Sequence, residues 1–226
     1  MNFFQFLKSL DDLLFEVVSW LIFYPVTMWR ALRHPLRMMD YAQAELDRPD
    51  EESFDSALSP PILLLLTVLA GHGLELALIG ESELIADTKG LAGLINDDTS
   101  LILLRLVAFA TFPLIFAAHT LRTQGIPMTR RSLEGPFFAQ CYANAPYALL
   151  VSLAATLSVM PRDEWRLAAI VLFIVTAAAF IAVQTMWFRK TLNAGLPRAF
   201  LHALIAYLEA ILFMVALGWL VGGASI

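Results

Sequence analysis

Five long apolar runs, separated by short polar segments, organise most of this chain. The runs cover residues 61–80, 101–121, 142–160, 167–188 and 199–221. Each is close to the ~20 residues that a helix needs to cross the hydrocarbon core of a bilayer. The pattern therefore predicts an all-α membrane protein in which residues 61–221 form a bundle of five transmembrane helices.

An amphipathic segment lies within residues 1–38, ahead of the bundle. Three polar residues share one face of a helix over residues 13–29: Asp12, Glu16 and Ser19. Apolar residues share another face: Leu10, Leu14, Val17 and Leu21. Aromatic residues and trailing arginines complete the pattern of a helix that lies in the membrane interface or re-enters it. A sixth span is the alternative, because the seventeen residues 13–29 reach the lower length limit for crossing.

The segment 39–60 is rich in Asp and Glu and contains the breakers "RPD" and "SPP". This composition predicts a solvated acidic linker, with a docking surface for a basic partner as the alternative. Ser59 stands at the N-cap position before two prolines, where the first span is expected to begin. Residues 222–226 form a short tail beyond the last span.

Lysine and arginine are unevenly distributed among the segments that connect the spans. Eleven lie before the first span or in the second and fourth connections, and three lie in the other two connections. Because basic segments stay in the cytoplasm, we expect a multi-pass protein of the cell's inner membrane, with a cytoplasmic N-terminus and an external C-terminus. The basic loops are also expected to contact anionic lipid.

Composition agrees with the membrane assignment and excludes several function classes. Of the 226 residues, 59% are hydrophobic and 15% charged, whereas soluble domains have about 45–50% and about 25%. The net charge of −5 argues against a nucleic-acid partner. The single cysteine, Cys141, excludes an intrachain disulfide and a multi-cysteine metal site. Because the common catalytic and nucleotide-binding motifs are absent, we predict no enzyme activity, no metal and no cofactor.

The order of these features resembles the Yip family of small integral membrane proteins and its bacterial relatives, often loosely called permeases. The matching features are "FYPVTMWRALRHP" ahead of the bundle, "LSPPILLLL" at the start of the first span, and five closely spaced spans over residues 61–221. The resemblance implies a cytoplasmic N-terminal segment followed by five spans. Eukaryotic members are associated with Rab proteins and vesicle traffic, but no partner site can be assigned to a residue here.

Charged residues inside the spans are the first candidates for function, because an isolated charge in the bilayer is costly. A helix rise of ~1.5 Å per residue places Glu75 of the first span and Arg105 of the second at nearly the same depth. Consecutive spans run antiparallel, so we predict an intramembrane ion pair between them. A structural clamp between neighbouring helices is its simplest role.

Two further groups of polar residues are expected at matching depths. His72 and Glu209 fall near the midplane, where they form a proton-accepting site if the first and fifth spans are neighbours. His119, Gln184 and His202 fall near the cytoplasmic edge on three helices. There they form either a site for a lipid headgroup or a metal, or ordinary residues of the membrane edge.

Two functions remain after these observations. The first is a non-catalytic scaffold or partner subunit in a membrane assembly, binding a membrane protein or further copies of itself. The alternative is a small permease or proton-coupled transporter whose midplane site uses His72, Glu75 and Glu209. Five spans do not divide into the inverted repeats of many transporters, which favours the scaffold.

Overall fold

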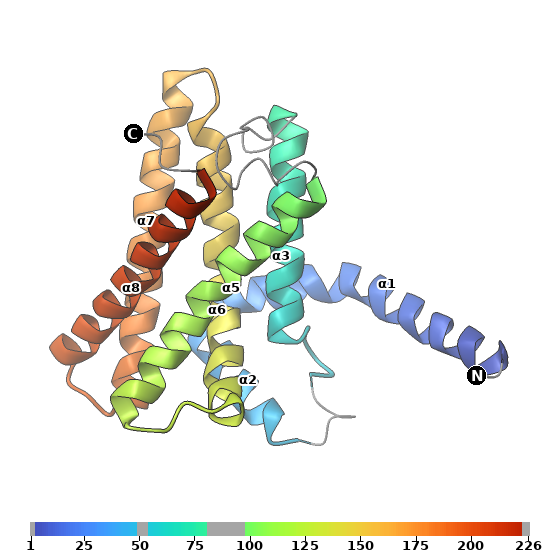
Figure 1. Cartoon of the computed structure of the whole chain (residues 1–226), viewed down its shortest axis with the longest axis horizontal. Coiled ribbons are helices and arrows are strands. Elements are labelled where there is room, and N and C mark those ends of the chain that lie inside the picture. The colour runs from blue at the N-terminus through green and yellow to red at the C-terminus, as the bar shows by residue number, and fades with distance from the viewer. Residues whose placement is uncertain (1–2, 49–53, 81–97, 223–226) are drawn as a thin grey trace.

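A computed structural model describes residues 3–48, 54–80 and 98–222, and all regular structure in them is helical (Figure 1). The helices are α1 (Phe3–Arg33), α2 (Pro35–Leu46), α3 (Pro60–Ile79), α5 (Asp98–Gln124), α6 (Arg130–Ser158), α7 (Asp163–Thr191) and α8 (Leu196–Gly222). Successive helices from α3 to α8 alternate in direction and form one bundle. The predicted all-α bundle of five helices with a preceding N-terminal helix is confirmed. The acidic connection over residues 81–97 and residues 223–226 of the predicted tail lie outside the described residues.

Helix α6 stands at the centre of the bundle. It contacts α1, α2, α3, α5 and α7, and every residue from Ala139 to Ala148 is buried. A helix covered on all sides by protein can carry polar residues that a lipid-facing helix excludes. The predicted span 142–160 is therefore the second half of a longer central helix that begins at Arg130.

The central position of α6 explains why it differs from the helices that are long and apolar enough to cross a membrane. In the described residues these are Leu13–Arg33, Pro60–Ile79, Ile102–Gln124, Asp163–Thr191 and Leu196–Leu217. Helix α6 is not among them, because buried Gln140 and Asn144 lower the hydropathy of its middle. Hydropathy measures the fit of a segment to lipid, and α6 is surrounded mainly by other helices.

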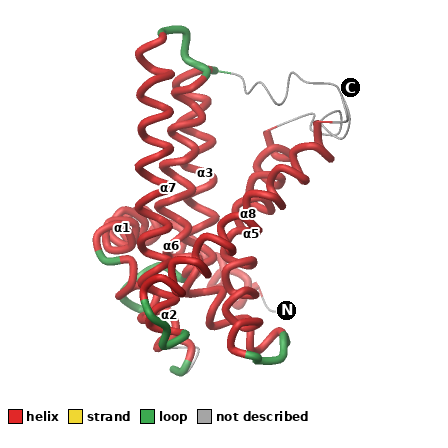
Figure 2. The backbone as a smooth tube through the Cα atoms, turned by 90° about the vertical axis from the view of Figure 1, so that its left-hand side faces the viewer, coloured by secondary structure: helices red, strands yellow, loops and turns green. Residues whose placement is uncertain are grey.

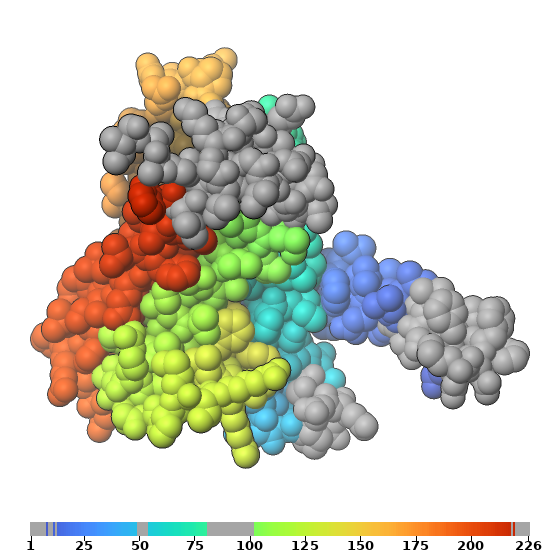
Figure 3. Space-filling model, in the orientation of Figure 1, coloured from blue at the N-terminus to red at the C-terminus, as the bar shows by residue number. Residues whose placement is uncertain are grey.

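Helix α1 runs across the bundle instead of along it. Figures 1 and 2 show α1 at a steep angle to α3 and α7, and Figure 3 shows its described part projecting from the body of the molecule. Its apolar side chains are exposed, with Phe15, Leu21 and Ile22 each more than two-thirds accessible. This orientation agrees with a helix lying in the membrane interface, where such side chains meet lipid.

The acidic segment before α3 differs from the predicted solvated linker over 39–60. Its first part belongs to α2, which packs on α6 and buries one face: Met38, Met39, Ala42 and Glu45. The buried Glu45 carboxylate accepts a hydrogen bond from the backbone amide of Phe54 at 2.7 Å and pairs with Arg48 at 2.8 Å. The apolar residues of "MMDYA" are spaced as on one face of a short helix, but the acidic residues that follow led to the prediction of a linker.

The start of α3 is also held in place by its neighbours. The backbone amide of Leu58 donates to the Thr27 hydroxyl at 3.1 Å, and the Tyr142 hydroxyl donates to the Leu58 carbonyl at 2.6 Å. Arg30 donates to the Ser56 carbonyl at 2.8 Å. As expected, Ser59 is the N-cap residue with prolines in the first turn, although its side chain makes no capping hydrogen bond.

The bundle helices form two groups that separate toward one end. The axes of α3, α6 and α7 are nearly parallel, whereas the axes of α5 and α8 are inclined away from them (Figure 2). Aromatic side chains join the two groups at the level where they meet. Tyr147 of α6 stacks on Phe180 of α7 with ring centroids 4.4 Å apart, and its hydroxyl lies 2.9 Å from that of Tyr207 on α8.

Candidate functional site

The first candidate site is an outer cluster of His72, Glu75 and Arg105 between α3 and α5. Arg105 forms an ion pair with Glu75, which is the contact that the sequence predicted. The two side chains are only 20% and 16% exposed. The Arg105 guanidinium also lies 3.1 Å from Nδ1 of His72, which is buried. Arg105 therefore bridges two groups of α3 that stand one turn apart.

Arg105 is the hydrogen-bond donor of this outer cluster. A guanidinium only donates hydrogen bonds, so Nδ1 of His72 accepts from Arg105. The same guanidinium pairs with Glu75. The arrangement suits a clamp that fixes how α3 and α5 meet.

A close helix contact lies one residue from His72. A Cβ placed on Gly71 would stand 3.1 Å from both Cβ and Oγ of Ser152 on α6, closer than ordinary van der Waals contact. A Cβ on Gly73 meets nothing within 4 Å. Of the two glycines beside His72, only Gly71 allows the close approach of a neighbouring helix.

The second candidate site is an inner cluster of His119, Arg122, His202 and Glu209 between α5 and α8. Nε2 of His119 lies 3.2 Å from Nδ1 of His202, as expected for residues of the same membrane edge. Glu209 pairs with Arg122 at 2.6 Å and lies 3.5 Å from Nδ1 of His119. This differs from the predicted contact of Glu209 with His72. Because α8 leans with α5, its midpoint lies beside the last turns of α5 (Figure 2).

The inner cluster is a continuous chain of polar contacts between α5 and α8. His119 faces a carboxylate on one ring nitrogen and His202 on the other. The contacts therefore run from Glu209 through His119 to His202.

His202 also borders a polar cavity of about 260 Å³ at the same end of the bundle. The cavity is lined by the ends of α5 and α7 and the start of α8: Thr123, Gln124, Thr191, Leu192, Asn193, Ala194, Arg198 and His202. Among the described residues, no group of three or more His, Cys, Asp or Glu side chains could hold a metal ion. Of the inner cluster, His202 is the residue that lines this cavity.

Gln184 does not belong to the inner cluster. It forms two reciprocal hydrogen bonds with Gln140 of α6, at 3.0 and 2.7 Å, and both amides are fully buried. Sequence reasoning missed Gln140 because the predicted span began two residues later, at Tyr142. A helical pattern extended back to Thr129, which forms a capping box with Ser132, identifies Gln140 as an interior residue.

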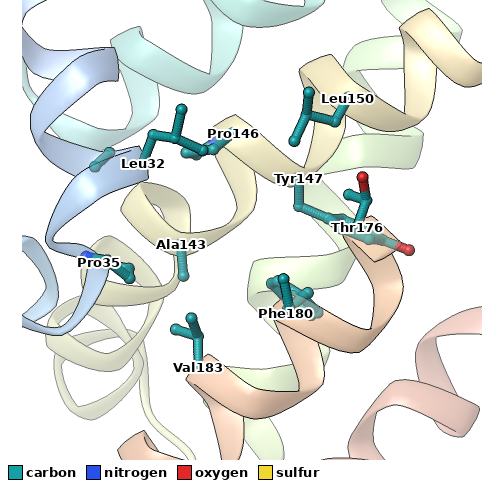
Figure 4. Close-up of a pocket in the computed structure, with 11 residues that line it drawn as sticks. Leu32, Pro35, Ala143, Pro146, Tyr147, Leu150, Thr176, Phe180 and Val183 are labelled. Carbon is teal, nitrogen blue, oxygen red and sulfur yellow. The ribbon is translucent and has the colours of Figure 1, made fainter. Parts of the chain in front are cut away.

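An apolar slot lies where the elbow between α1 and α2, at residues 33–35, meets α6 and α7 (Figure 4). Its volume is about 100 Å³. Pro146 and Tyr147 form its α6 wall, and Thr176 and Phe180 form its α7 wall. No pattern in the sequence predicts this slot, because its walls come from three separate segments.

No family model, curated protein or solved structure matches this chain. The assignment therefore rests on the helices themselves, of which five in the described residues are long and apolar enough to cross a bilayer. The chain is a multi-pass α-helical membrane protein. Its internal polar clusters and its exposed apolar faces are its candidate functional features.

Proposed function

We propose that this protein is a non-catalytic scaffold or partner subunit of a membrane assembly. The observation that carries the proposal is that the charged residues between its helices pair with one another instead of converging on one cavity. Glu75 pairs with Arg105, and Glu209 pairs with Arg122. A charge with a close opposite partner loses less on leaving water and fixes how two helices meet.

The outer faces of the bundle give the scaffold a surface for partners. Helices α7 and α8 expose large apolar side chains along their length, including Ile174 and Leu212. In a bilayer such side chains face either lipid or another membrane protein. An assembly partner, including a second copy of this chain, would cover part of them.

The charge distribution supports an orientation with the α2 end of the bundle in the cytoplasm of a cell with an inner membrane. The α5–α6 and α7–α8 connections lie at the same end as α2 (Figure 1), and their basic residues suit a cytoplasmic surface with anionic lipid. A plan of N-terminal segment followed by five helices is also what a Yip-like protein would have. Membership of that family remains a proposal.

The scaffold proposal is tested by the mass of the particle that contains the chain in its native membrane. The full chain is crosslinked in membranes, extracted in polymer nanodiscs and weighed by mass photometry. We expect a mass above one 25.1 kDa chain in its disc. Ile174→Trp and Leu212→Trp should lower the mass if these faces hold the partner, whereas Leu69→Trp on α3 is the matched control. A wild-type particle with a single chain and no other protein overturns the proposal.

A proton-coupled permease is the second candidate, and the inner cluster is the observation that favours it. The chain from Glu209 through His119 to His202 ends at the polar cavity. Proton flux into proteoliposomes with a trapped pH dye separates the two functions. We expect flux no greater than in protein-free liposomes. Flux that His202→Ala and Glu209→Gln abolish, and that the exposed control His34→Ala leaves intact, would replace the scaffold by a permease.

A further inference from the structure

The apolar slot of Figure 4 continues into a second, basic cavity. The second cavity has a volume of about 470 Å³ and is lined at the α1–α2 elbow by Arg33, His34 and Arg37. Pro35 and Val183 line both cavities, so the two adjoin along α7, and together they are called the groove. The groove is apolar at its deep end and positively charged at its outer end.

The groove has the length of one leaflet of a bilayer. Its α7 wall runs from Thr176 at the apolar end to Met186 at the basic end. At ~1.5 Å per residue this is ~15 Å, half of the ~30 Å hydrocarbon core. The slot reaches mid-membrane while the arginines stand at the membrane surface.

The chemistry of the two ends matches one kind of molecule. Arg33 and Arg37 are exposed on the surface of the elbow, and guanidinium groups bind phosphate through paired hydrogen bonds. The deep walls, formed by Pro146 and Phe180 among others, offer carbon surface to an alkyl chain. A phospholipid combines these two parts, since it has a phosphate at the membrane surface and alkyl chains that extend across about one leaflet.

We propose that this groove binds one anionic phospholipid of the leaflet on the α2 side. Its phosphate lies against Arg33 and Arg37, and one acyl chain enters the slot between Pro146 and Phe180. The lipid ties the end of α1 to α7. This site is separate from the basic loops between the bundle helices, and it does not depend on the scaffold function.

The test measures how tightly the full chain binds phosphatidylglycerol. Purified protein in mixed micelles of phosphatidylcholine and phosphatidylglycerol is examined by native mass spectrometry while phosphatidylglycerol is titrated. We expect one phosphatidylglycerol to bind more tightly than phosphatidylcholine. The double variant Arg33→Gln/Arg37→Gln should bind it roughly 25-fold more weakly, the factor for losing two basic side chains at an anionic surface. Arg130→Gln/Arg131→Gln removes two exposed arginines from the same end of the bundle and should bind as the wild type does.

The apolar end has its own matched pair of variants. Ala179 lines the slot, whereas its neighbour Ala178 lines a third cavity, between α7 and the start of α8, which shares no residue with the slot and adjoins only the basic cavity. Ala179→Phe should fill the slot and abolish tight binding, and Ala178→Phe should leave it unchanged. This pair decides the question even where the double arginine variant fails to fold.

Several results would overturn the proposal. Equal weakening by the two arginine pairs means diffuse attraction of anionic lipid to a basic surface. Tight binding that survives Ala179→Phe, or that only Ala178→Phe abolishes, places the lipid elsewhere. Displacement of the bound lipid by excess glycerol phosphate, at the same concentration in wild type and Ala179→Phe, means that the headgroup binds without the slot.

Discussion

Replacing Glu75 with Gln removes the carboxylate that Arg105 faces between α3 and α5. Arg105 then stays positively charged inside the bundle, because a guanidinium does not lose its proton in a protein. Replacing Arg105 with Gln leaves Glu75 beside His72 at 3.9 Å. Glu75 therefore keeps a polar neighbour on its own helix, whereas the Arg105 charge loses its carboxylate. Glu75→Gln should therefore destabilise the protein more than Arg105→Gln.

The size of the effect follows from the burial of the pair. Removing one partner of a buried ion pair costs about 3–5 kcal/mol, and side chains that are 20% and 16% exposed belong at the lower end. We expect about 3 kcal/mol for Glu75→Gln, a fall in Tm of roughly 6–12 °C for a chain of this size. The double variant removes Arg105 together with the carboxylate it pairs with, so it should be more stable than Glu75→Gln alone.

Thermal unfolding of the four proteins in detergent completes a double-mutant cycle. A coupling energy on the order of 2 kcal/mol supports the clamp. The exposed pair of Asp163 and Arg166 is the matched control, since its atoms are 3.9 Å apart at the surface and its cycle should give almost no coupling. Additive losses in the Glu75–Arg105 cycle, or coupling no larger than in the control, would refute the reasoning.

Two further predictions concern helix packing. Gly71→Ala should destabilise the protein by about 1–3 kcal/mol because its new Cβ meets Ser152, whereas Gly73→Ala should leave the stability unchanged or raise it by up to ~1 kcal/mol. The Tm of each variant in detergent measures both effects. If Ser152→Gly does not restore the stability of Gly71→Ala, the contact is contradicted. Gln140→Met should lower the free energy of unfolding by ~1–3 kcal/mol, because it leaves the buried Gln184 amide without its partner. The double variant Gln140→Met/Gln184→Met should be more stable than Gln140→Met alone. If its Tm is no higher, the amide pair is disproved.

The contact of Glu75 with Arg105 could be predicted because the two helices are consecutive. Consecutive membrane helices run antiparallel, and counting residues from the same membrane edge then gives the depth of each charge. The same counting did not find the partners of Glu209. That estimate assumed helices along the membrane normal, whereas α5 and α8 are inclined, so equal residue counts do not give equal depths (Figure 2).

The amino-acid sequence by itself determined the existence and order of the five bundle helices and the end of the bundle where basic residues gather. These properties depend on each segment separately, through its fit to lipid and the charges beside it. Only the tertiary structure decided that α6 is central, that α2 packs on it, and that Gln140 meets Gln184. Such contacts join segments far apart in the chain, and they depend on side-chain shape and helix inclination, which hydropathy does not record.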